Sequence, residues 1–195
     1  MNLREAIIGG GILPERADVV IREAQRTGLP LAIGCVMLMK ESGGGKSVWG
    51  HDKTKVPDDV LPYRKGGPVT EQNYRAYLAR RGQIGNQGVG PTQLTYPGFQ
   101  DEADRRGGCW RPKVNIAYGF EILAGYVKSG SVRDAFSRYN TGRPGDTAYG
   151  RDAMVRLPKW DAIVRGATPG RRTLRRGDTG PDVRELQRLL NEVGT

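Results

Sequence analysis

The stretch Leu31-Ala32-Ile33-Gly34-Cys35-Val36-Met37-Leu38-Met39-Lys40-Glu41-Ser42-Gly43-Gly44-Gly45 decides the fold expected for this chain. Its first nine residues carry no charge and are almost all apolar, so a helix formed here is buried on nearly every side. Glu41 follows directly before one small residue and three glycines, which favour a helix end. Burial disfavours the charged form of a carboxyl group, so Glu41 should keep its proton to unusually high pH. The stretch predicts a buried helix ending in either a general acid or an ordinary solvated glutamate.

The composition bounds the size and the partners of the protein. With 195 residues the chain has room for one good core and a small appendage. Lys and Arg outnumber Asp and Glu by 31 to 21, and the formal charge of +10 suits a polyanionic partner: nucleic acid, an anionic membrane surface or a bacterial cell wall. The basic residues are scattered and show no helix-turn-helix or zinc-knuckle spacing, so we expect no nucleic-acid partner.

The chain lacks the patterns of secretion, membrane insertion and disulfide cross-linking. The N-terminal apolar run is short and is broken by glycines at 9–11, which indicates no signal peptide, and no stretch is long enough to span a bilayer. We therefore expect synthesis in the cytoplasm and no membrane insertion, and we also expect a monomer. The two cysteines, Cys35 and Cys109, are too few for a disulfide scaffold, and Cys35 in an apolar helix is by default a free thiol.

Helical periodicity outlines a mainly α fold with a minor β part, an α+β arrangement. A long segment rich in Gly, Pro, Asp and Lys over 43–67 predicts a functional loop, 82–95 predicts a small hairpin or a pair of loops, and 101–113 is expected to be a polar, basic connection. Besides the apolar helix, helices are expected over Pro14–Thr27, after the cap Thr70, over about 114–127, after the cap Ser131, and over Tyr149–Leu157 with Trp160, Ile163 and Val164 continuing the pattern.

The composition divides the chain into one domain and a short tail. We expect a domain over 1–164, a linker rich in Gly, Pro and Arg over 165–173, and a last piece over 174–195. The last piece carries a single amphipathic helix pattern and is too small to fold alone.

Three short motifs follow one another along the chain: Glu41-Ser42, Gly90-Pro91-Thr92-Gln93 and Tyr139-Asn140-Thr141-Gly142. In this order they resemble the lysozyme-like superfamily of lytic transglycosylases and goose-type lysozymes, as found in phage endolysins. In that superfamily an apolar helix ends in Glu-Ser, a Gly-x-x-Gln segment lines a glycan cleft, and a later helix ends in Tyr-Asn-x-Gly. The insertion between Glu41 and Gly90 is longer than in the compact transglycosylases. The sequence from Leu174 to Leu190 also resembles the first helix of a peptidoglycan-binding module.

The resemblance implies a peptidoglycan-degrading enzyme with a lysozyme-like helical domain and a small β-hairpin or loop region beside a glycan cleft. The implied reaction cleaves the β-1,4 bond between N-acetylmuramic acid and N-acetylglucosamine, with Glu41 as general acid. The implied setting is the host cytoplasm of a phage, from which an endolysin reaches the cell wall for lysis. The residues expected to contact the glycan strand are Ser42, His51, Gly90, Gln93, Tyr139 and Asn140.

A second catalytic carboxylate depends on the type of cleavage. An inverting hydrolase requires a general base across the sugar from the acid, with room for a water. Asp52, Asp58 and Asp59 are the candidates, and Asp52 comes first because the preceding residues Trp49 to His51 can brace it. A lytic transglycosylase needs no second acid, because the 6-hydroxyl of the sugar attacks and leaves a 1,6-anhydro product.

Two other functions stay open on the residues alone. A cell-wall amidase or peptidase would pair Cys35 or Cys109 with His51, although Cys35 lies mid-helix, where activation of a thiolate is poorly served. A non-catalytic wall-binding or nucleic-acid-binding protein would fit the basic charge. His51 is the only histidine, so the chain has no multi-histidine zinc site, and we expect neither a metal nor a cofactor.

Overall fold

The computed structural model describes residues 2–167, and this part of the chain is mainly helical, as predicted. The last helix continues to Ala167, so residues 165–167 are helical and do not open the expected linker. The rest of that linker and the expected peptidoglycan-binding piece over 174–195 lie outside the described residues. Within the described part, no helix combines the length and the hydropathy needed to cross a membrane.

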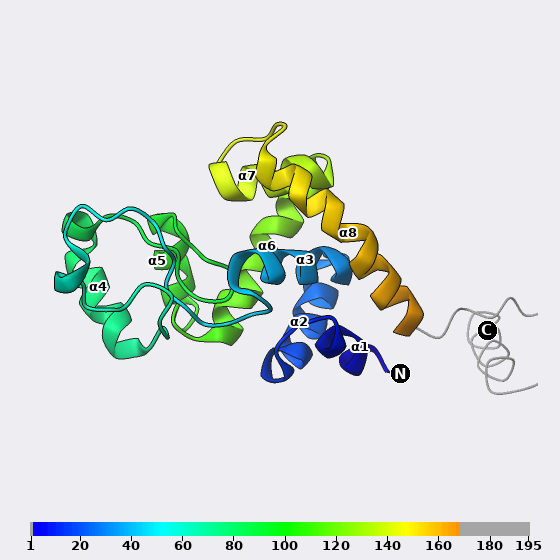
Figure 1. Ribbon diagram of the computed structural model, residues 1–195, viewed down its shortest axis with the longest axis horizontal. Coiled ribbons are helices and arrows are strands. Elements are labelled where there is room, and N and C mark those ends of the chain that lie inside the picture. The colour runs from blue at the N-terminus through cyan, green and yellow to red at the C-terminus, as the bar shows by residue number, and fades with distance from the viewer. Residues whose placement is uncertain (1, 168–195) are drawn as a thin grey trace, which may run out of the picture.

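Two lobes make up the described part of the chain, as Figure 1 shows. Helices α4 and α5 and long loops, residues 43–111, form what we name the loop lobe. The other helices form the helical lobe. The elements are α1 (Leu3–Gly9), α2 (Pro14–Thr27), α3 (Leu31–Ser42), the 3-10 turn η1 (Asp58–Val60), α4 (Glu71–Ile84), α5 (Pro97–Arg105), α6 (Pro112–Ser129), α7 (Val132–Thr141) and α8 (Ala148–Ala167).

Local capping fixes several helix starts where the sequence predicts them. The Thr70 side chain accepts a hydrogen bond from the backbone N–H of Asn73, whose side chain accepts one from the Thr70 N–H in return. The Ser131 hydroxyl accepts one from the backbone of Asp134 and so starts α7. Pro14 occupies the first turn of α2, where its missing N–H costs nothing.

Two helices are absent from the sequence-based prediction. Helix α1 has only seven residues, too few for a readable period, and it is fixed by a capping box between Asn2 and Glu5 and by packing on α2 and α8. Helix α5 occupies part of the segment expected to be a polar connection. Its buried side includes Gln100 and Ala103, so tertiary contacts rather than an apolar stripe hold it in place.

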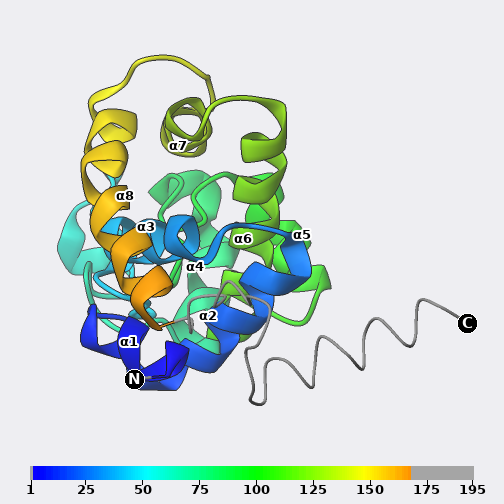
Figure 2. The same ribbon diagram turned by 90° about the vertical axis from the view of Figure 1, so that its right-hand side faces the viewer.

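Helix α3 runs through the centre of the helical lobe, which confirms the buried helix expected from its sequence. Every residue from Ala32 to Leu38 is buried, and Figure 2 shows α3 among α2, α6 and α8. A Cβ atom on Gly34 would lie 2.7 Å from the ring of Phe120, so the absent side chain lets α6 approach the helix closely. The end of α3 is thereby held at a fixed point between the two lobes.

The loop lobe has its own core, which is built from aromatic rings. Trp49 stacks on Tyr63 with ring centroids 4.0 Å apart and meets Tyr77 edge-on at 5.1 Å. Among the described residues no β-sheet forms. Three isolated antiparallel bridges occur instead, including Val89 with Leu94, so residues 85–95 form loops rather than a regular hairpin, and residues 82–84 belong to α4.

Candidate active site

Glu41 lies in the last turn of α3 and lines a cavity of about 750 Å³. Gly43 ends the helix in the left-handed conformation, with φ 61°. The cavity lies between the two lobes, and its other lining residues are His51, Asp52, Asn86, Gln93, Leu94, Thr95, Tyr96, Phe99, Tyr126, Arg138, Tyr139, Asn140, Thr141 and Gly142.

The environment of Glu41 favours its protonated form. Burial, which has the largest effect, and the negative charge of Asp52 both raise the pKa of the carboxyl group, which lies at about 7. The hydrogen bond donated by the Tyr149 hydroxyl and the positive charge of Lys40 act in the opposite direction. The Tyr149 bond goes to Oε1, which orients the carboxyl group and leaves Oε2 for the proton. The prediction of a glutamate with an elevated pKa at the end of the apolar helix is therefore confirmed.

Tyr149 is itself held by a group of charged side chains behind Glu41. The Lys40 ammonium lies 4.0 Å from the centre of the Tyr149 ring, and its side chain is only 7% exposed. Lys40 also forms an ion pair with Asp152, which accepts a 2.8 Å hydrogen bond from Arg156. Arg156 and Lys40 together lower the pKa of Asp152 to about 2. None of these side chains lines the cavity, and together they fix Tyr149, and through it Glu41.

The turn from Gly90 to Gln93 is held by side chains from three helices. Ser42 donates a 2.6 Å hydrogen bond to the Pro91 carbonyl oxygen, and Tyr139 donates a 2.7 Å bond to that of Thr92. Asn115 of α6 accepts a 2.8 Å bond from the Thr92 N–H. These contacts connect the Glu-Ser, Gly-x-x-Gln and Tyr-Asn motifs directly, although they are far apart in the sequence.

Gln93 has an unusual backbone and a fixed side chain. Its φ of 50° is the one positive value of a non-glycine residue within the described chain. The side-chain amide donates to the carbonyl oxygens of Val48 and Gly90, at 2.9 and 2.8 Å. A Cβ atom on Gly88 would lie 2.5 Å from Oε1 of Gln93, so this glycine leaves the space that the amide occupies. The Gln93 side chain is thus positioned at the cavity wall.

Asp52 is the one of the three candidate second carboxylates that lines the cavity. It is exposed, and its Oδ2 accepts a 2.8 Å hydrogen bond from the Gly88 N–H. Asp58 and Asp59 lie in η1, outside the cavity lining, and Asp58 forms a 2.9 Å ion pair with Lys65. The lysine lowers the pKa of that carboxyl group.

The structure brings six of the eight residues expected in the site onto one cavity: Glu41, His51, Asp52, Gln93, Tyr139 and Asn140. The other two, Ser42 and Gly90, are buried outside its lining, so they hold the turn instead of facing a ligand. Sequence reasoning missed the contact of Tyr149 with Glu41, and it missed Arg138 in the lining. Both positions result from packing between segments about a hundred residues apart in the chain, for which the sequence carries no local signal.

The cysteines do not form a nucleophilic site. Both Cys35 and Cys109 are free and buried, and neither lines the cavity that contains His51. Burial raises the pKa of the Cys109 thiol to about 12, and it raises that of Cys35 as well. Because the thiolate is the reactive form, these environments oppose the use of either cysteine as a nucleophile.

Comparisons of the chain with protein-family models, curated proteins and solved structures find no match.

Proposed function

We propose that the protein degrades peptidoglycan by cleaving the β-1,4 bond between N-acetylmuramic acid and N-acetylglucosamine, with Glu41 as general acid. One observation carries the proposal: a carboxyl group with a pKa of about 7 lines an open cavity that also holds a second carboxylate, Asp52. Most glycosidases use two carboxyl groups in different environments, one as the general acid and the other as the base or nucleophile.

Each group around the cavity has a role in this reaction. Glu41 would donate the proton on Oε2 to the leaving glycosidic oxygen, while Tyr149 holds Oε1. The positive charge that develops on the sugar would be stabilised by the carboxylates. Gln93 and Asn140 would hydrogen-bond the N-acetyl sugars, and the exposed ring of Tyr96 would pack against them. The +10 charge of the chain suits an anionic cell wall, and a phage endolysin is the biological setting that the motifs suggest.

Asp52 supports hydrolysis, although the motifs also fit a lytic transglycosylase. In a hydrolase, Asp52 would activate a water on the far side of the sugar ring. In a transglycosylase, Glu41 would take back a proton as the sugar 6-hydroxyl attacks, and Asp52 would have no chemical part. The two reactions therefore differ both in their product and in their need for Asp52.

The test is mass spectrometry of muropeptides released from purified peptidoglycan by the wild type and by Asp52→Asn. Reducing ends together with loss of activity in Asp52→Asn indicate a hydrolase. Anhydro ends with activity retained in Asp52→Asn indicate a transglycosylase. Release of stem peptides without new sugar ends, or no release at all, would refute the proposed glycosidase.

A further inference from the structure

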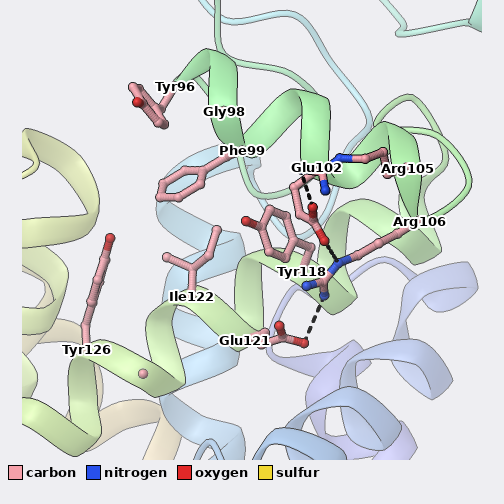
Figure 3. A pocket seen from close by; sticks show the side chains of 11 residues that line it. Tyr96, Gly98, Phe99, Glu102, Arg105, Arg106, Tyr118, Glu121, Ile122 and Tyr126 are labelled. Carbon is pink, nitrogen blue, oxygen red and sulfur yellow. Dashed lines mark hydrogen bonds and ion pairs between the residues drawn. The ribbon is translucent and has the colours of Figure 1, made fainter.

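A second groove runs between α5 and α6 and has a volume of about 530 Å³ (Figure 3). Its floor includes Ile122 and Gly125 of α6, and Tyr96 stands at the start of α5. None of the motifs singled out in the sequence contributes to it.

This groove continues the cavity that contains Glu41. Tyr96, Phe99 and Tyr126 line both spaces. Figure 3 shows these three rings toward one end of the groove, and the ion pairs between α5 and α6 toward the other. A chain molecule that leaves the cavity past Tyr96 and Tyr126 therefore enters the groove directly.

The lining of the groove forms a row of aromatic rings. Tyr96 is 63% exposed and meets Phe99 edge-on, with the ring centroids 5.2 Å apart. Phe99 in turn meets the ring of Tyr118 at 6.0 Å. An exposed tyrosine presents an apolar face with a polar tip, which matches a sugar ring with its C–H face and its hydroxyl edge.

The charged groups of the groove neutralise one another. Arg106 forms ion pairs with Glu102 at 2.7 Å and with Glu121 at 3.0 Å, and its guanidinium lies 4.3 Å from the centre of the Tyr118 ring. Glu121 also pairs with Arg26 at 3.4 Å. Because both carboxylates already have cationic partners, this wall offers hydrogen-bonding edges with little net charge, which suits the hydroxyl and amide groups of a glycan.

We propose that the groove between α5 and α6 binds further sugars of the glycan strand, beyond those held in the cavity of Glu41. This inference rests on the proposed function, because it assumes that the strand lies in the cavity. It predicts that the enzyme cleaves long strands more efficiently than short ones, since binding energy from remote sugars raises the rate at the reacting bond.

Gly125 offers a clean way to close the groove. It is exposed within α6, lines this groove and not the Glu41 cavity, and a Cβ atom there would meet nothing within 4 Å. Gly125→Phe should fill the space, whereas Gly125→Ala keeps it open and serves as the matched control. Both variants replace a mid-helix glycine with a better helix former, so both should fold.

The experiment measures kcat/KM on peptide-free glycan strands of graded length. We expect Gly125→Phe to lose about tenfold on long strands and to match the wild type on the shortest cleaved strand, while Gly125→Ala matches it throughout. Equal rates for Gly125→Phe and the wild type at every length would overturn the proposal. So would a Gly125→Phe defect that appears only on strands that carry stem peptides, because the groove would then belong to the peptide.

Binding separates this inference from the proposed function. The affinity of long peptide-free strands is measured by calorimetry on Glu41→Gln, with and without Gly125→Phe. A tenfold weaker affinity with Gly125→Phe supports the groove even if the wild type cleaves no glycan, in which case only the proposed glycosidase fails. If Gly125→Phe leaves the affinity for long strands unchanged, the groove is not part of the glycan-binding site.

Discussion

The two lobes that enclose the cavity are stabilised in different ways. The helical lobe packs apolar side chains from α2, α3, α6, α7 and α8 into one continuous core. The loop lobe depends on stacked aromatic rings and on side chains that bond to backbone groups. Buried polar atoms without a hydrogen-bond partner in the described structure include Oγ of Ser47, Nε1 of Trp49 and Oη of Tyr63, all in the loop lobe.

Because of this difference, the two lobes contribute different kinds of residue to the cavity. The helical lobe supplies the group whose position and protonation matter most, Glu41, from a helix that has almost no freedom to move. The loop lobe supplies Asp52 and His51 from irregular, exposed chain. Segments with few buried apolar contacts open at lower free energy than a packed core. In the proposed function, the fixed acid and the fixed turn over 90–93 would face the more adaptable segment that carries His51 and Asp52, which would suit a polymeric substrate.

The largest expected effect comes from removing the acid of the helical lobe. Glu41→Gln keeps the shape and can still accept the hydrogen bond from Tyr149, so it should fold, but turnover of peptidoglycan should fall by about 10²–10⁴-fold. In the wild type the activity should decline as the pH rises through about 7, because Glu41 then loses its proton. Turbidity assays of wall suspensions across pH check both points. Undiminished lysis by Glu41→Gln would refute the role of this residue.

The core of the helical lobe should tolerate truncation poorly. Phe120 is fully buried and packs against Gly34, so Phe120→Ala should lower the free energy of unfolding by about 3–5 kcal/mol. Urea denaturation followed by both circular dichroism and tryptophan fluorescence measures this loss. Trp160 lies in the helical lobe, whereas Trp49 and Trp110 lie in the loop lobe, so the fluorescence of a Trp160→Phe background reports on the loop lobe. Coincident transitions in that background would show that the two lobes unfold together. A loss below 1 kcal/mol would contradict the close packing of α3 and α6.

Glu41 should lower the free energy of unfolding at high pH. The folded pKa of Glu41, about 7, lies above the ordinary glutamate value of 4.5, so between these pH values the native state holds a proton that the unfolded chain releases. Stability is therefore greatest below about pH 4.5 for this group and declines as the pH rises toward 7. Glu41→Gln should gain on the order of 3 kcal/mol over the wild type above pH 7 and little at about pH 4. Thermal melts at both pH values test this, and a gain independent of pH would argue against the raised pKa.

Removing a tyrosine hydroxyl should change the free energy of unfolding in opposite directions in the two lobes. The Tyr139 hydroxyl donates a 2.7 Å bond to Thr92, whereas the buried Tyr63 hydroxyl has no partner in the described structure. Tyr139→Phe should therefore lose about 1 kcal/mol of stability, and Tyr63→Phe should be neutral or gain up to about 1 kcal/mol. Paired denaturation curves give both values. Equal losses would mean that the Tyr63 hydroxyl is satisfied after all.

The sequence predicted the parts of the molecule whose determinants are local. Helices α2 and α7 follow from their apolar periods, and α3 follows from its continuous apolar run. Their ends follow from residues such as Ser131 and Gly43. The site could be predicted as far as its motifs reach, so Glu41 and Gln93 were identified while Tyr149 was not recognised as the partner of Glu41. Ser42 was assigned to the ligand, because a motif names a residue without saying which way its side chain points. Helices α1 and α5 were missed since tertiary packing decides them.

The hydrogen bonds from three helices that hold the turn from Gly90 to Gln93 have a consequence for substrate binding. Ser42, Asn115 and Tyr139 together hold this backbone at the point where the lobes meet, so the site beside Glu41 is preorganised before any ligand arrives. In the proposed reaction, a glycan strand would therefore meet a cavity wall that is already in place at this turn. The sugar would then have to distort toward the reactive ring shape, and the rigid turn would contribute to catalysis by keeping its position.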